Sequence, residues 1–248
     1  MREVAIGCAG WSIPGQHRDL FGDGDSVLAR YATRFPVVEV NSSFYRSHRQ
    51  GTYVRWAESV PATFRFSVKM PRTISHELGL RGAGPALDRF LDEAAGLGAK
   101  LGAYLLQLPP SHRLDLRVAS TFFRMLRRRS DAPLACEPRH ASWFTPEATA
   151  LLERYAVARV TADPPIAAAS DPAGRASRWS YWRMHGTPRM YYSDYPEETL
   201  RHLAHDVAPR RMAPVVPWVI FDNTALGHAV ANAARLQDIL RLTPRIRN

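Results

Sequence analysis

The chain has 248 residues, of which 46% are hydrophobic, and a formal net charge of +10. Its length and composition exclude a largely disordered chain and favour one globular domain with a sizeable core. It contains neither a signal peptide nor an apolar run long enough to span a membrane, which predicts a cytoplasmic protein without membrane contacts.

Eight apolar, strand-like runs occur along the chain, and each is followed by polar residues. The runs are Val4–Cys8, Val37–Val40, Phe64–Val68, Ala103–Leu106, Leu134–Cys136, Ala158–Thr161, Ser180–Met184 and Trp218–Phe221. Because strands that alternate with helices form parallel sheets, eight such units predict an α/β fold with a single (β/α)₈ barrel of the TIM type. We therefore predict one domain over residues 1–242 and a loose C-terminal tail at 243–248.

Amphipathic segments predict helices in most of the gaps between these strands. The segments are Asp25–Phe35, Thr52–Val60, Pro85–Leu97, Leu116–Arg128, Ala148–Tyr155, Pro196–Val207 and Ala225–Leu240. Asp25 and Ser26 are candidate N-caps of the first helix, and Thr145 before Pro146 marks the start of the fifth. The segment Pro164–Trp179 has no helical stripe, so we predict a long loop in place of the sixth helix, one that could act as a lid.

Polar residues at the C-terminal ends of the strands meet at one mouth in a barrel of this type, and active sites lie there. Side chains two positions apart on a strand point to the same face, and three strands end in such polar pairs. The pairs are Glu39 with Asn41, Glu137 with Arg139, and Arg183 with His185. Since buried charges must be paired or reach the mouth, the pairs predict a charged ring; an interior salt-bridge network without a catalytic role is the alternative. Gln107, Asp163 and Asn223 follow three further strands and extend the ring.

Lys69 follows the third strand and is one of only two lysines among 33 basic residues. A buried lysine, unlike an arginine, can lose its proton and act as a base or as a Schiff-base nucleophile. An ordinary ion pair with Glu39 on the neighbouring strand is the alternative. Arg72 and His76 lie in the loop that follows and could reach a substrate anion.

The segment Glu137–Trp143 offers an acid, a guanidinium, an imidazole and an aromatic ring close together. Its histidine, His140, is equally compatible with a site residue and with a packing residue. His185 is the stronger candidate, because Gly186 after it indicates a close backbone approach or a tight turn.

These residues resemble a known family, the domain of unknown function 72 family, also called YecE-like. The matching stretches follow in order over nearly the whole chain: Gly7–Trp11, Val38–Tyr45, Phe66–Arg72, Leu106–Pro110, Cys136–Trp143, Trp182–Gly186 and Phe221–Thr224. The resemblance implies a TIM-type barrel and no particular activity, because the family is uncharacterised.

Two departures from the family pattern affect the site. The family usually has a tyrosine and a second tryptophan soon after the first, where this chain has Ile13 and His17, so one aromatic wall of the pocket is not expected here. It also tends to have paired asparagines after the eighth strand, where this chain has Asp222 and Asn223. We therefore assign Asn223, and not Asp222, to the site.

We predict an enzyme, a lyase, isomerase or hydrolase, that acts by acid/base chemistry on a small phosphorylated or carboxylated molecule. Glu137 and His185 would exchange protons, Arg139 and Arg183 would hold the anion, and Lys69 would act as a base or stabilise negative charge. The predicted catalytic residues are Lys69, Glu137, His185 and Glu39. The predicted substrate-binding residues are Asn41, Tyr45, Arg72, Gln107, Arg139, Trp143, Asp163, Arg183 and Asn223.

A metal-dependent phosphoesterase or nuclease is the first alternative. Its possible ligands are Glu39, Glu137, Asp163 and His185. Cationic side chains in the same mouth would repel a metal ion, and no local metal-binding motif is present, so no cofactor is predicted.

A non-catalytic nucleic-acid-binding protein is the second alternative, suggested by the net charge of +10. Its densest basic run is Arg124–Arg129, at the end of a predicted helix, where cations also complement the helix dipole as an ordinary solvated helix end. The sequence does not indicate an oligomeric state.

Overall fold

The structure, a computed structural model, describes residues 4–166, 179–209 and 215–242. Most of the Pro164–Trp179 segment lies outside the described residues, and so does the tail at 243–248. The loop, lid and tail predicted for these segments therefore stay predictions.

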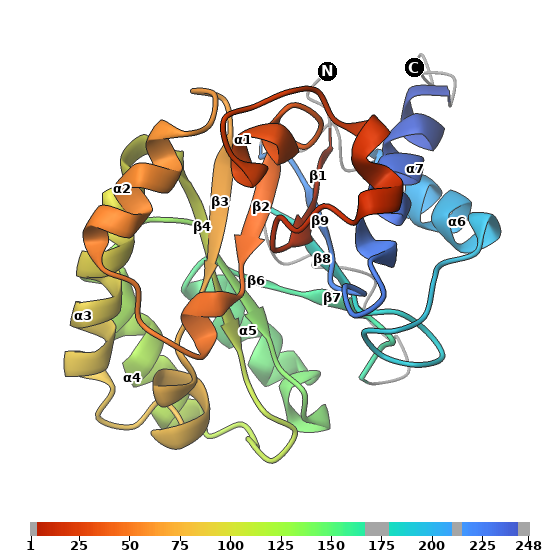
Figure 1. The fold of residues 1–248 in the computed structure, drawn as a ribbon. Helices are drawn as coiled ribbons and strands as arrows, with labels where there is room; N and C mark the ends of the chain where they lie inside the picture. Colours follow the sequence, from red (N-terminus) through yellow and green to blue (C-terminus); the bar gives the residue numbers. More distant parts are fainter. Residues whose placement is uncertain (1–3, 167–178, 210–214, 243–248) are drawn as a thin grey trace.

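One nine-stranded parallel sheet forms a nearly closed barrel (Figure 1). The strands are β1 (Ala5–Ala9), β2 (Val37–Val40), β3 (Arg65–Lys69), β4 (Leu101–Gln107), β5 (Leu134–Glu137), β6 (Val157–Arg159), β7 (Thr161–Asp163), β8 (Tyr181–Met184) and β9 (Trp218–Phe221). Their order around the sheet is β6-β5-β4-β3-β2-β1-β9-β8-β7. The predicted α/β barrel is confirmed, with a break at one strand.

The predicted sixth strand is divided into β6 and β7 on either side of Val160. β6 pairs with β5, whereas β7 pairs with β8. Both edges of the sheet therefore belong to one short stretch of chain. The barrel is therefore closed by the continuous chain that leads from β6 to β7, and no ladder of hydrogen bonds in the described structure joins these two strands.

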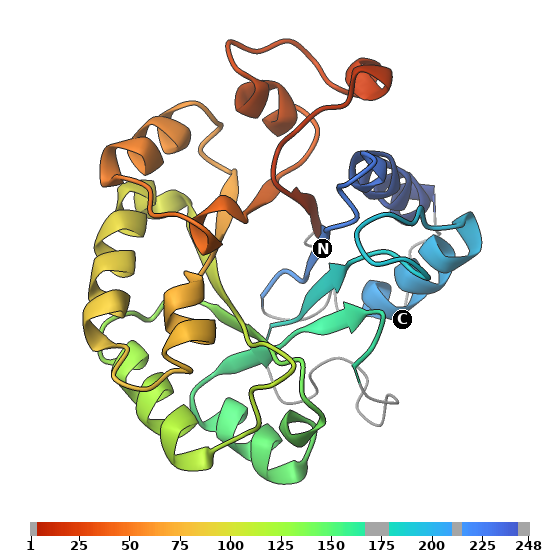
Figure 2. The same ribbon diagram turned by 60° about the horizontal axis from the view of Figure 1, so that its bottom comes forward.

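Seven α-helices surround the strands within the described part of the chain (Figure 2). They are α1 (Val27–Ala32), α2 (Gln50–Glu58), α3 (Gly84–Ala94), α4 (Leu116–Arg127), α5 (Pro146–Arg154), α6 (Glu197–Val207) and α7 (His228–Leu242). The hydroxyls of Ser26 and Thr145 accept the amide hydrogens of Ala29 and Ala148, which confirms both predicted N-caps. None of the described helices has the length and hydrophobicity needed to cross a membrane.

Short helical turns shape the loops that follow the strands. Four of them come directly after strands: η1 (Gly15–Leu20), η2 (Ser42–Phe44), η3 (Thr73–Glu77) and η5 (Ala141–Trp143). A further turn, η4 (Ala95–Lys100), leads from α3 into β4. Folded turns of this kind hold the residues that follow β2, β3 and β5 close to the strand ends.

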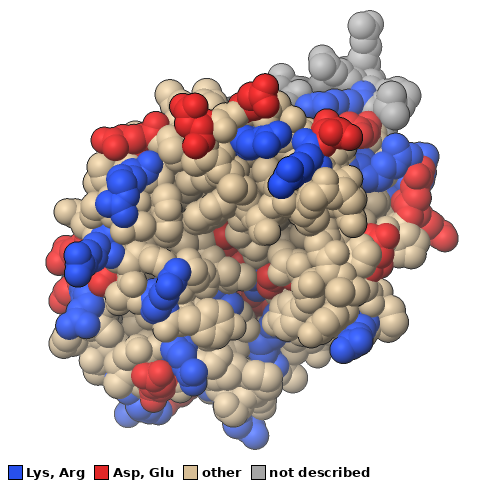
Figure 3. Space-filling model, viewed as in Figure 1, with Lys and Arg blue, Asp and Glu red and all other residues tan. Residues whose placement is uncertain are grey.

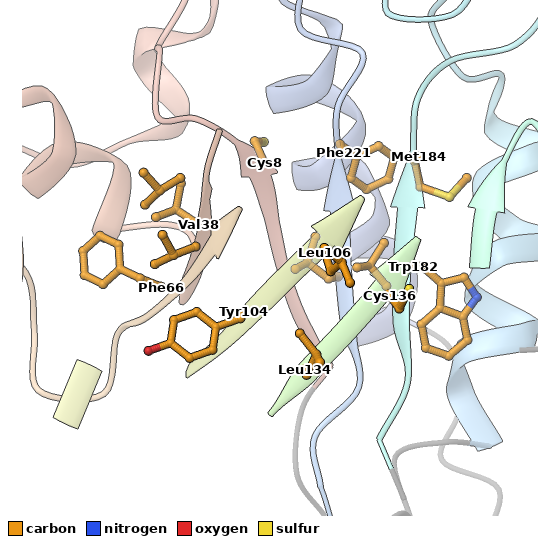
Figure 4. Packing of buried hydrophobic residues seen from close by; sticks show 14 of the residues in the cluster. Cys8, Val38, Phe66, Tyr104, Leu106, Leu134, Cys136, Trp182, Met184 and Phe221 are labelled. Atoms are coloured by element: carbon orange, nitrogen blue, oxygen red, sulfur yellow. The ribbon is translucent and has the colours of Figure 1, made fainter. Parts of the chain in front are cut away.

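Alternate residues of each strand face two different cores, as the period of two in a strand requires. On β8, Trp182 and Met184 pack in the layer between the strands and the helices, whereas Tyr181 belongs to the barrel interior. Figure 4 shows the outward set, with side chains from several neighbouring strands packed together. The same alternation decides which polar residues enter the mouth.

The barrel interior is lined largely by small side chains, among them Ala5, Ala9, Ala103, Ala135 and Ala158. These alanines leave room for the large side chains that cross the barrel. Aromatic rings fill one level of the interior: Tyr181 stacks on Trp218 with ring centroids 6.0 Å apart, and Trp179 meets Trp218 edge-on with centroids 5.9 Å apart.

Gly102 is required at the edge of this stack. A Cβ atom at this position would lie 2.6 Å from the Trp218 ring, so any other residue would displace the indole.

Candidate functional site

The guanidinium of Arg183 lies at the centre of the polar interior and is fully buried. Its Nε and Nη2 donate to the two carboxylate oxygens of Glu39 at 3.0 and 2.6 Å. Nη1 donates to Glu137 at 2.6 Å, and Nη2 also donates to Asp222 at 2.9 Å. Three carboxylates from three different strand ends therefore surround one cation.

His185 connects two of these carboxylates. Its Nε2 lies 2.8 Å from Glu137 Oε1, and its Nδ1 lies 3.1 Å from Asp222 Oδ2. The ring is fully buried. We call Glu39, Glu137, Arg183, His185 and Asp222 the closed cluster, because their polar groups bond to one another.

Opposite charges keep Glu137, Asp222 and Arg183 ionised inside the closed cluster. Burial alone would raise the pKa of Glu137, but Arg183, the hydrogen bond to His185 and Arg139 outweigh it and hold this pKa well below its ordinary value. The pKa of Asp222 is lowered in the same way, with Arg183 as the main opposing charge. Burial acts to lower the pKa of Arg183, and the three carboxylates raise it well above its ordinary value.

Asp222 is the site residue that the sequence assignment missed. Along β9, Trp218 and Ile220 face the barrel interior, so Asp222 continues this face, and Asn223 points toward the helices. The Asn223 amide donates to Ser193 and Asn232, which ties the loop after β8 to α7. The assignment of Asn223 in place of Asp222 is therefore wrong, and the period of two could have corrected it.

Lys69 lies at the end of β3 and differs from every member of the closed cluster. Among the described residues, no carboxylate comes within 4.0 Å of its Nζ, so the predicted ion pair with Glu39 does not form. The Nζ atom lies 4.2 Å from the centre of the Phe44 ring, and the residue is 6% exposed. Burial, followed by repulsion from Arg183, lowers the pKa of Lys69 to about 8.

Asn41 lies beside Lys69 at the mouth. Val40 pairs with Val68, which places Asn41 and Lys69 at the ends of adjacent strands. The Asn41 amide donates to Asp222 at 3.3 Å, whereas its buried Oδ1 has no hydrogen-bond partner among the described residues.

Gln107 ends β4 on the interior face and is half-buried, next to Glu137 in the strand register. We call Asn41, Lys69 and Gln107 the open edge, because each can still bond to a ligand.

Arg139 follows β5 and is bonded to the closed cluster. One nitrogen, Nη2, forms an ion pair with Glu137 and lies 2.7 Å from His185 Nε2. Nη1 contacts the Met190 sulfur at 4.0 Å, and the buried Nε has no hydrogen-bond partner in the part of the chain that the structure describes. The side chain is 7% exposed, so this guanidinium is held firmly and still has unused donors.

Tyr191 covers His185 from the loop after β8. The two ring centroids lie 5.7 Å apart at an interplanar angle of 88°. The backbone of Tyr191 has φ +69°, a left-handed conformation that is costly for a tyrosine. Gly186 has φ +95°, which confirms the tight turn predicted after His185, and a Cβ there would lie 2.9 Å from the Ser193 carbonyl oxygen.

Several predicted site residues lie away from the open edge or are already bonded. Asp163 Oδ1 accepts from the hydroxyls of Tyr195 and Thr187, so it serves the loop after β8. Trp143 is fully buried, and its Nε1 donates to the His112 carbonyl, so it packs beneath the loop and does not line the pocket. His140 accepts the Ser142 amide as the N-cap of η5, which favours its interpretation as a structural residue.

Tyr45 and Arg72 lie on exposed loops. Tyr45 is 75% exposed, and its ring contacts Phe44 edge-on. Arg72 is paired with Glu77 at 3.2 Å, and about half of its side chain is exposed. Both could contact only the outer part of a bound molecule.

Three of the predicted catalytic residues are buried. Glu39, Glu137 and His185 are at most 1% exposed, and their polar atoms are bonded within the barrel interior. Arg183 is fully buried as well. A substrate could reach these side chains only if the cluster opened, and the catalytic and anion-binding roles assigned to them stay predictions.

The carboxylates considered as metal ligands already bond to a cationic side chain. The carboxylates of Glu39 and Glu137 are directed at the Arg183 guanidinium, which occupies the position that a cation would take. Asp163 bonds to another loop, and the described part of the chain contains no group of three histidine, cysteine or acidic residues that could hold a metal ion.

Arginines of the basic run Arg124–Arg129 form bonds within the protein. Arg127 donates to the carbonyls of Tyr155, Ala132 and Ala156, and Arg129 pairs with Asp88. Figure 3 shows Lys and Arg interspersed with Asp and Glu over the face in view, with charged atoms of both signs in a central recess. No broad basic patch is visible on that face.

A family model described as "Protein of unknown function DUF72" matches residues 5–247. The chain is 36% identical to the UPF0759 protein YecE of Escherichia coli (strain K12) over 106 residues, which are 43% of this chain and 38% of that protein. It is 27% identical to the UPF0759 protein YunF of Bacillus subtilis (strain 168) over 152 residues, which are 58% of this chain and 53% of that protein. The matches thus span at most about half of the length of these curated relatives.

Two solved structures of DUF72 family proteins share the fold. The protein from Enterococcus faecalis V583 superposes with a TM-score of 0.81 at 23% identity, covering 97% of this chain and 96% of that chain. The protein from Thermotoga maritima MSB8 gives a TM-score of 0.79 at 24% identity, covering 97% of this chain and 100% of that chain. At these identities the likeness supports the barrel fold alone.

Proposed function

The chain belongs to the DUF72 family, whose description names no activity, and so we propose a function from the site itself: an enzyme whose Lys69 amine performs acid/base chemistry on a small anionic molecule in the barrel mouth. The observation that carries this proposal is the state of Lys69. It is a nearly buried amine without a carboxylate partner among the described residues, placed beside the polar groups of the open edge.

An amine in this environment suits proton transfer near neutral pH. With its pKa lowered to about 8, Lys69 is unprotonated in part of the molecules at pH 7 to 8 and can accept a proton. A lysine at its ordinary pKa, or one held in an ion pair, would keep its proton. The lowered pKa and the missing partner therefore support the same role.

Arg139 supports the anionic nature of the substrate. Its Nε is buried without a partner, and its Nη1 contacts only a sulfur atom in the described structure. A phosphate or carboxylate oxygen could accept a charge-assisted hydrogen bond from one of these donors. The closed cluster would hold Arg139 in position through Glu137.

Proton exchange between candidate substrates and solvent tests this function. A panel of small phosphorylated and carboxylated molecules is incubated with the protein in D₂O, and ¹H NMR records loss of C–H signals or formation of products. We expect turnover or exchange of at least one molecule, and a decrease of roughly 100-fold or more in Lys69→Met. Lys100→Met is the matched control, because Lys100 Nζ donates to the carbonyls of Ala57 and Val60, away from the mouth. An equal rate in Lys69→Met would overturn the role of Lys69.

Anion binding tests the role of Arg139 separately. Calorimetric titration with inorganic phosphate and with the active panel member should show weaker binding in Arg139→Met and partial recovery in Arg139→Lys. Arg81→Met, which removes an exposed partner of Asp115, serves as the control for loss of one positive charge. Equal weakening in Arg81→Met would point to a general effect of charge and reject a defined anion site.

A further inference from the structure

We propose that Lys69 acts by condensing with a carbonyl group, so that the substrates are small aldehydes or ketones that carry a phosphate or carboxylate. This inference rests on the proposed function and names its substrate class. Its basis is the surroundings of the Nζ atom, which has an aromatic face on one side and no carboxylate among the described residues to hold its proton.

The contrast with Lys100 shows why Lys69 is suited to nucleophilic attack. Lys100 directs its ammonium at two backbone carbonyls, which are good acceptors for a charged donor. Lys69 makes no comparable hydrogen bond within the described residues, and the Phe44 ring beneath it offers only a weak cation–π contact. An amine whose protonated form is so weakly stabilised, and which remains 6% exposed at the mouth, can attack an electrophile.

The neighbouring groups match the polar ends of such a substrate. Asn41 Oδ1 is a buried acceptor without a donor, and it lies at the end of the strand next to Lys69. It can accept a hydrogen bond from a substrate hydroxyl or from the nitrogen of the adduct. Gln107 can donate or accept, and Arg139 offers unused donors for the anionic end.

The proposed step is balanced without a cofactor or an oxidant. The unprotonated Nζ adds to the carbonyl carbon, forming a C–N bond, and the carbonyl oxygen takes a proton to give a carbinolamine. Loss of the hydroxyl with a second proton releases one water and leaves an imine. Protonation of the imine nitrogen weakens the adjacent C–H bond, whose electrons form the enamine while its proton passes to a solvent water at the mouth. The enamine carbon then takes a proton back from water, and hydrolysis consumes one water to return the carbonyl compound and the free amine.

Borohydride trapping tests the inference on the intact protein. The protein is mixed with dihydroxyacetone phosphate or with glyoxylate at pH 8, and sodium borohydride reduces any imine to a stable secondary amine. Intact mass and peptide mapping locate the adduct. We expect a single addition at Lys69, at least 10-fold above that at Lys100, and none in Lys69→Met. Uncharged dihydroxyacetone should label Lys69 less, and Arg139→Lys should keep more of the phosphate-probe labelling than Arg139→Met.

The possible outcomes separate this inference from the proposed function. Proton exchange that depends on Lys69, with no adduct from either probe or from the active panel member, overturns the covalent step and leaves the acid/base function in place. Equal labelling of Lys69 and Lys100 also overturns it, because the site would then give no selectivity. Absence of both exchange and adduct rejects the proposed function together with the inference.

Discussion

The closed cluster and the open edge lie next to each other in one barrel, yet they use their polar groups in opposite ways. In the closed cluster, Arg183 is surrounded by three carboxylates and is fully buried. At the open edge, Lys69 lacks a carboxylate partner among the described residues, and Asn41 keeps an unused buried acceptor. The difference indicates which charges maintain the structure and which remain available to a ligand.

Breaking the closed cluster should have the largest effect. Arg183→Met would leave three buried carboxylates without their common cation, and removal of one partner of a buried ion pair costs about 3–5 kcal/mol. Urea unfolding should show this loss, or the variant should not fold. Arg81→Met, at an exposed pair, should change the free energy of unfolding by less than about 1 kcal/mol. Similar small losses in both variants would show that the cluster is not a structural element.

The stability of the protein at alkaline pH should report on Lys69. Its pKa is about 8 in the folded chain, against an ordinary value of 10.5. Between these two pH values the unfolded chain binds the extra proton, so the contribution of Lys69 to stability rises as pH increases from about 8 to about 10.5. The rise is at most about 3.5 kcal/mol, because each pKa unit corresponds to about 1.4 kcal/mol.

Urea unfolding of the native protein and of Lys69→Met across this range measures that difference. We expect the native protein to gain stability relative to the variant as the pH rises. Parallel curves for the two proteins would show that Lys69 has an ordinary pKa.

Replacing the two lysines should separate function from stability. Lys69→Met should lose turnover and borohydride labelling without a loss of stability at pH 8, because methionine fills similar space without a buried charge. Lys100→Met should keep the labelling at Lys69 and lose about 1–3 kcal/mol, since two carbonyls lose a charged donor. Thermal unfolding and peptide mapping measure the two effects, and the reverse pattern would contradict the distinction.

A neutral residue at position 222 should have the smallest effect on stability and should still alter the open edge. Asp222→Asn keeps an oxygen acceptor for Arg183 but loses its charge, so we expect a loss of about 1 kcal/mol. Because the Asp222 carboxylate acts to raise the pKa of Lys69, the substitution should lower that pKa further. The pH dependence of the labelling rate at Lys69 measures the change. Asp88→Asn, at the exposed pair with Arg129, should leave this profile unaltered.

Much of the fold follows from local patterns that are visible in the sequence. The eight apolar runs correspond to the observed strands, because a strand buried on both faces needs a nearly continuous apolar segment. The caps at Ser26 and Thr145 and the turn at Gly186 depend on neighbouring residues only, and the structure contains all three. The break at Val160 was not predicted, because it arises where the barrel closes.

The composition of the mouth was only partly predictable. The period of two placed Glu39, Glu137 and Arg183 in the interior, and it would also have placed Asp222 there. The pattern along one strand does not show which side chains from other strands meet them, so it leaves a catalytic ring and an interior salt-bridge network as alternatives. Trp143 was assigned to the pocket on its position in the chain, whereas the loop folds its indole inward.

By itself the sequence determined the strands, the helices and the set of polar residues directed into the barrel, because hydrophobic periodicity and capping act between residues close in the chain. Only the tertiary structure determined which charged side chains pair with one another and which remain available to a ligand. Arg183 meets carboxylates from β2, β5 and β9, which lie far apart in the sequence, and is neutralised by them. Lys69 is also a charged residue at a strand end, but its amine lies over the Phe44 ring without a carboxylate partner among the described residues. Burial and electrostatic pairing depend on distances in space, which a linear pattern does not contain.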